Sequence, residues 1–184
     1  MTDPQTDVCC SPSLGTAAQP SGMGVAGVPV VYLFKTPDEA RTLAGQLARF
    51  CPDPAQAMIG LLELLLNAVE HGNLGISYAE KSALVRHSAL GAELERRLLL
   101  PEYADKTATV SVSWTGDEIH FLIRDQGTGF DWSPYLEIDP ARVRHPHGRG
   151  IAWARGVSFQ RIEYRGIGNE VLAVVRSASL SQNE

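Results

Sequence analysis

The chain has 184 residues, of which 44% are hydrophobic and 20% charged, as expected for one folded domain with a tail. Its formal net charge of −5 argues against a protein that binds nucleic acid through bulk charge. No apolar run approaches the ~20 residues of a membrane span, and the N-terminal MTDPQTD lacks the features of a secretory signal, so we expect a cytoplasmic protein. The cysteines, Cys9, Cys10 and Cys51, lack zinc-binding spacing, and an incidental pair at 9–10 is favoured over a reactive one.

The chain begins with a tail, a strand and a helix. Residues 1–27 are rich in Pro, Ser, Gly and Thr without apolar periodicity, which predicts disorder. The β-branched and aromatic residues at 28–34 predict a short strand. Thr36 then predicts an N-cap, with Pro37 at the first helical position and Glu39 completing a capping box.

A second start signal at Asp53 predicts a helix over residues 54–71, ended by Gly72 as its C′ residue. Most of this helix is apolar. Positions three and four apart share one helix face, and such spacing places four polar residues in a stripe: Glu63, Asn67, Glu70 and His71.

The polar stripe has two interpretations. A solvated outer face is the ordinary one, but leucines and a valine flank the stripe on both sides, which favours a polar seam inside a pocket. The side-chain oxygen of Asn67 can bind Mg²⁺ without adding charge, and the Glu63 carboxylate one turn earlier can accept a proton. This chemistry requires a phosphate site and an adenine site elsewhere in the chain.

The middle of the chain predicts two helices and then a hairpin. Ser77 and Glu80 predict another capping box, and residues 77–99 are amphipathic. A pair of solvated surface helices is the favoured interpretation there, and a partner-docking surface is the alternative. Alternating apolar residues then predict a hairpin over 107–124, and a last hairpin over 159–176.

The motif DQGTGF follows the end of a predicted strand. Its first residue, Asp125, can accept a hydrogen bond from an exocyclic amine such as that of adenine. Gly127 and Gly129 allow close approach of the backbone to a ligand or a positive φ. An ordinary turn is an equally good interpretation of this motif taken alone.

Beyond the motif, residues 131–146 lack a regular pattern, and a loop of that length is usually functional. Gly148, Arg149 and Gly150 then open a short predicted helix, where backbone N–H groups and a guanidinium can meet phosphates. Solubility is the alternative explanation for the arginines of this region.

Taken in order, the E-xxx-N-A helix, the D-x-G-x-G-F motif, the arginine-bearing loop and G-R-G-I resemble the ATP-binding domain of the gyrase, histidine-kinase and MutL superfamily. Within it, the chain looks most like bacterial anti-sigma-factor serine/threonine kinases. The resemblance implies an α/β (α+β) fold of the Bergerat type, a two-layer sandwich of helices on a mixed β-sheet. It divides the chain into a tail (1–27), a histidine kinase-like ATP-binding domain (28–177) and a polar tail (178–184).

The same resemblance implies roles for individual residues. Glu63 matches the general base, and Asn67 the Mg²⁺ ligand. Asp125 matches the carboxylate that reads adenine, with residues 131–146 as the ATP lid. The backbone against base and ribose is matched by Gly127 and Gly129, and the phosphate-facing turn by Gly148, Arg149 and Gly150. The sequence departs from the family at Gly168-Asn169, where a threonine often lies near the adenine.

The resemblance also implies a function. The chain is expected to bind ATP and Mg²⁺, to phosphorylate an anti-anti-sigma-like protein, and to sequester a sigma factor or response regulator, with a homodimer suggested by the family. A non-catalytic ATP-dependent binding switch and the catalytic part of a split histidine kinase are the alternatives.

Overall fold

Alternating apolar and polar residues build a five-stranded sheet with the strand order β1-β2-β3-β5-β4. The computed structural model describes residues 28–132 and 154–176, to which every structural statement below refers. The strands are β1 (Val30–Phe34), β2 (Ala108–Thr115), β3 (Glu118–Arg124), β4 (Arg161–Arg165) and β5 (Glu170–Arg176). The predicted strands and both hairpins are therefore confirmed, and so is the α+β class.

The expectation of a mixed sheet is corrected, because all four strand pairs in the described ranges are antiparallel. Tight turns join β2 to β3 and β4 to β5, and two-residue or similarly short turns permit only antiparallel pairing. β1 pairs antiparallel with β2, and β4 runs in the same direction as β3, so β5, which follows β4 through a tight turn, pairs antiparallel with β3.

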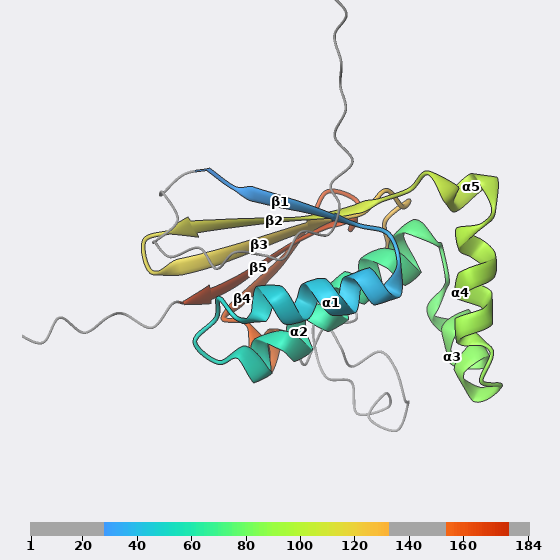
Figure 1. Cartoon of the computed structure of the whole chain (residues 1–184), viewed down its shortest axis with the longest axis horizontal. Helices are drawn as coiled ribbons and strands as arrows, with labels where there is room; N and C mark the ends of the chain where they lie inside the picture. Colours follow the sequence, from blue (N-terminus) through green and yellow to red (C-terminus); the bar gives the residue numbers. More distant parts are fainter. Residues whose placement is uncertain (1–27, 133–153, 177–184) are drawn as a thin grey trace, which may run out of the picture.

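Helices α1 and α2 cover one face of this sheet (Figure 1). The helices of the described residues are α1 (Pro37–Ala48), α2 (Pro54–Asn67), the π-helix η1 (Ala68–Asn73), α3 (Tyr78–Arg86), α4 (Leu90–Leu98), α5 (Pro101–Ala104) and the π-helical turn η3 (Ala154–Ser158). The core lies between α1, α2 and the sheet, where Leu61, Leu65 and Phe121 are fully buried. None of the helices described is both long and apolar enough to cross a membrane.

The predicted helix starts at Thr36, Asp53 and Ser77 are confirmed. At Ser77 the hydroxyl accepts a hydrogen bond of 3.2 Å from the Glu80 amide, whereas the Glu80 carboxylate pairs with Arg97. The Thr36 side chain accepts a hydrogen bond from the Glu39 amide, and the Glu39 carboxylate accepts one from the Thr36 amide, which completes the capping box. The Asp53 carboxylate accepts a hydrogen bond of 3.0 Å from the amide of Gln56. These caps satisfy amide groups that a helix leaves unpaired at its N-terminus.

The predicted end of the second helix is wrong. The chain does not stop at Gly72 but widens into η1, where the Leu74 amide donates to the Val69 carbonyl five residues back at 2.9 Å. The left-handed residue is Gly75, with φ of 63°, and it allows the chain to turn out of the helix. Gly72 has a different role, described with the site.

Helices α3, α4 and α5 project beside the sandwich (Figure 1), and we call residues 78–104 the appendage. Within the described helices of the appendage, Leu94 is the one residue with less than a tenth of its surface exposed. The predicted pair of surface helices is thus confirmed, and Pro101 opens an additional short helix, α5.

Close packing of α2 against η3 predicts a size limit at Gly60. A Cβ atom there would lie less than 3.0 Å from the side chains of Ser158 and Phe159. Gly60→Ala should therefore lower the free energy of unfolding by about 1–3 kcal/mol, measured by chemical denaturation. Gly91→Ala, where a Cβ meets nothing within 4 Å, is the matched control and should not destabilise. Equal stability of the two variants would contradict the described packing.

Candidate functional site

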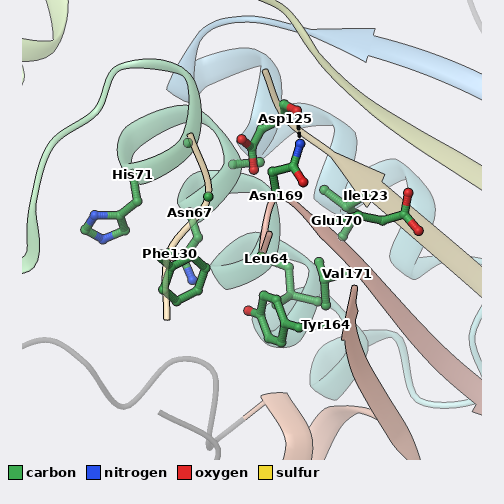
Figure 2. Close-up of a pocket in the computed structure, with 14 residues that line it drawn as sticks. Leu64, Asn67, His71, Ile123, Asp125, Phe130, Tyr164, Asn169, Glu170 and Val171 are labelled. Carbon is green, nitrogen blue, oxygen red and sulfur yellow. Dashed lines mark hydrogen bonds between the residues drawn. The ribbon is translucent and has the colours of Figure 1, made fainter. Parts of the chain in front are cut away.

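A pocket open to solvent lies where α2 and η1 meet the ends of β3, β4 and β5, with a cavity volume of about 30 Å³. Of the predicted site residues, Asn67, Asp125 and Gly129 line it, and Figure 2 shows Asn67 and Asp125 reaching it from opposite sides. Glu63 is not among its lining residues. Gly148, Arg149 and Gly150 lie outside the described residues, as does most of the predicted lid.

Asp125 follows β3 directly, as the sequence predicts. Its Oδ1 accepts a hydrogen bond of 2.8 Å from the Gly127 amide, and its own amide donates to the Asn169 carbonyl at 3.0 Å. Burial raises the pKa of the Asp125 carboxyl to about 6, against the opposing effects of the Gly127 amide and the Lys106 charge. The pocket thus contains a carboxylate that is costly to ionise and has capacity for a further hydrogen-bond donor.

Glycines bring η1 and the Asp125 loop into contact. A Cβ atom at Gly72 would lie less than 3.0 Å from the carboxyl atoms of Asp125, and one at Gly127 would lie equally close to the Gly72 carbonyl. Gly129 has φ of 75°, and its backbone packs against Ile167. The role of Gly72 was missed, because at a predicted helix end a glycine indicates a C′ residue and gives no sign of a long-range contact.

A second contact, also missed from sequence, joins the same two segments. Asn73, only 2% exposed, accepts a hydrogen bond of 2.8 Å through its side-chain oxygen from the Gln126 amide. The Gln126 side chain in turn accepts one of 2.8 Å from the Thr107 amide at the start of β2. This chain of hydrogen bonds fixes the end of η1 to the loop that carries Asp125.

Aromatic rings form one wall of the pocket. Phe130 and Tyr164 pack edge to face with ring centroids 5.6 Å apart (Figure 2), and Trp132 stacks on Tyr164 at the same distance. Burial, with the nearby charge of Asp125, raises the pKa of the Tyr164 hydroxyl, so this side chain is neutral at physiological pH. Flat apolar walls and a carboxylate suit a planar ligand that carries an amine.

The polar stripe of α2 divides between two surroundings. Asn67 and His71 line the pocket, whereas Glu70 is buried and pairs with Lys81 at 2.6 Å. Glu63 is half-buried, and burial raises the pKa of its carboxyl, with a smaller lowering by Lys81 and a smaller raising by Glu70. The predicted seam is therefore present, but only part of it faces the pocket.

Comparison of the chain with protein-family models and with curated protein sequences finds no match. The described residues also contain no group of three His, Cys, Asp or Glu side chains placed to hold a metal ion. Asn67, the predicted Mg²⁺ ligand, is one of the residues that line the pocket.

The raised pKa of Asp125 predicts a pH dependence of stability. The carboxyl favours the folded state while protonated, and this contribution is lost as the pH rises from about 4 through about 6. Asp125→Asn does not titrate, so its unfolding free energy relative to wild type should increase over that range and level off above it. Denaturation at several pH values measures this difference.

Glu163→Gln is the matched control, because it removes an exposed carboxylate of β4 whose pKa the hydrogen bond from Arg165 lowers. Since that pKa is lowered rather than raised, the unfolding free energy of Glu163→Gln relative to wild type should not increase with pH. A difference for Asp125→Asn that stays flat between about pH 4 and 6 would mean that the folded protein ionises Asp125 without a burial cost.

Proposed function

We propose that the pocket binds ATP, with the adenine amine donating a hydrogen bond to Asp125. The observation that carries this proposal is the half-buried carboxylate held against the backbones of Gly72 and Gly127. The aromatic wall offers stacking area, and the Gly127 amide already orients one carboxylate oxygen. A donor from the ligand would give the buried charge a second hydrogen bond.

Mg²⁺ would enter with the nucleotide. The residues present fit such an ion, because Mg²⁺ is usually held by one or two protein oxygens together with phosphates and water. Asn67 supplies a neutral oxygen at the pocket wall, on the helix face that leads toward Glu63. When bound, the ion would neutralise charge on the phosphates, and the task of Asn67 is to hold it at this wall.

The activity proposed is that of a regulatory serine/threonine protein kinase resembling anti-sigma factors, acting on a protein partner. Phosphoryl transfer depends on positioning, a metal and a residue that orients the acceptor. Glu63 lies one helical turn before Asn67, and burial raises its carboxyl pKa toward the range useful to a general base. The acceptor hydroxyl would donate its proton to the Glu63 carboxylate.

One observation supports a second candidate, an ATP-dependent binding switch without turnover. Glu63 is half-buried and does not line the pocket. A carboxylate that reaches neither nucleotide nor acceptor supplies no catalysis. Binding and transfer therefore need separate tests.

Asp125→Asn tests nucleotide binding. The amide can present a donor where the adenine amine also donates, so Mg-ATP affinity should fall by roughly 100-fold or more, which corresponds to about 3 kcal/mol. Calorimetric titration measures the affinity, and Asp117→Asn, in the turn between β2 and β3, is the control. In the wild type, affinity should also decrease as the pH falls through about 6, because Asp125 becomes protonated. Near-normal affinity of Asp125→Asn would remove this residue from the site.

Glu63→Gln tests transfer. The variant should bind Mg-ATP as the wild type does but lose about 100-fold or more in phosphoryl transfer to a serine-bearing partner. Acid-stable phosphoprotein formation measures transfer, since phosphoserine survives acid and phosphohistidine does not. Glu95→Gln, on α4 of the appendage, is the control. If the wild type and Glu63→Gln both bind Mg-ATP but neither transfers phosphate, the result would favour the binding switch without turnover.

A further inference from the structure

An ion pair connects the appendage to the pocket wall. Glu70 belongs to η1 and is 3% exposed, and Lys81 belongs to α3, with its ammonium 2.6 Å from the Glu70 carboxylate. Apart from this ion pair, the same carboxylate oxygen, Oε2, has no hydrogen-bond partner among the described residues. A buried carboxylate is unfavourable unless a charge offsets it, and Lys81 supplies the opposite charge in contact with Glu70.

A second cation of the appendage binds the end of η1. Arg97 of α4 donates a hydrogen bond of 2.7 Å to the carbonyl of Leu74, the residue that caps η1. Its guanidinium is held in turn by Glu93 at 2.7 Å and by Glu80. The appendage therefore contacts η1 through a side chain and through the backbone.

Other residues of η1 contact the Asp125 loop. Asn73 accepts the hydrogen bond from Gln126, and Gly72 packs directly against the Asp125 carboxyl group. Between these contacts, His71 and Gly72 line the pocket (Figure 2 labels His71). The π-helix is thus held between the appendage and the loop that carries the proposed adenine contact.

We propose that Lys81 is a positioning residue: through Glu70 it fixes η1 so that His71 and Gly72 form the pocket wall against Asp125. This inference rests on the proposed function for its effect on nucleotide binding, but its structural claim does not. A merely stabilising role for Lys81 makes a different prediction. Substitution of Lys81 would then loosen the whole fold equally, and η1 would open no more readily than the other elements.

Hydrogen exchange tests the structural claim without a ligand. Lys81→Met should make the amides of Leu74 and Ile76, which bond back to η1, exchange about tenfold faster, with the β3 amide of Ile123 within about twofold of wild type. Glu70→Met/Lys81→Met replaces the ion pair by apolar side chains and should restore slow exchange. Unchanged exchange at Leu74 and Ile76, or no restoration in the double variant, would overturn the inference.

Mg-ATP titration then tests the link to the pocket. Lys81→Met should bind about tenfold more weakly than wild type, and Glu70→Met/Lys81→Met should recover most of the affinity. Arg96→Met is the control and should bind Mg-ATP as the wild type does. It removes an exposed cation of α4 whose one ion pair among the described residues is with Glu93. Undiminished affinity of Lys81→Met would overturn the positioning role.

The two proposals fail in different ways. A wild type that binds no Mg-ATP ends the proposed function, and the exchange rates at Leu74 and Ile76 still decide the role of Lys81. If Lys81→Met does not fold, Lys81→Gln takes its place, because its amide retains a donor for the carboxylate. If the Leu74 and Ile76 amides of Lys81→Gln exchange as slowly as in the wild type, the positive charge of Lys81 is not needed to fix η1.

Discussion

The pocket depends on the close approach of the η1 backbone to the carboxyl group of Asp125. A side chain at Gly72 or Gly127 would occupy the same space as the opposite segment, so both positions require glycine. The hydrogen bond from the Gln126 amide to the Asn73 side chain holds the two segments at this separation. The π-helical widening of η1 supplies the geometry of this close approach. Such π-helical turns are rare in proteins overall, but where they occur they are often at functional sites.

This approach has an electrostatic consequence. Packing against η1 excludes water from one side of Asp125, and burial raises the pKa of its carboxyl to about 6. The Gly127 amide compensates only in part. Near neutral pH the free protein therefore holds an ionised carboxylate that lacks full solvation, and a ligand donor would supply the missing hydrogen bond. Part of the free energy that burial costs the fold would in this way be recovered on binding of the proposed ligand.

Local features of the sequence predict much of the fold and some residues of the candidate site. The caps at Thr36 and Asp53 and the two hairpins depend on residues close in sequence, and Asn67 and Asp125 stand out as polar residues in apolar or strand-end settings. The contact between Asn73 and Gln126 joins residues 53 positions apart. Nothing local signals it, and the same holds for the ion pair of Glu70 with Lys81. Gly72 was assigned to a helix end because its real constraint comes from a distant loop.

The appendage shows why exposure alone is a poor guide to function. Most of its surface faces solvent, as the sequence indicates, yet Lys81 and Arg97 both reach back to η1. If Lys81 positions η1, then ordering of the pocket and ordering of the appendage are linked, and thermodynamic linkage acts in both directions. A ligand that fixes His71 and Gly72 would also restrain α3, and a protein bound to α3 would change the affinity of the pocket. The proposed nucleotide site and a partner surface would then be coupled through six residues of π-helix, Ala68–Asn73.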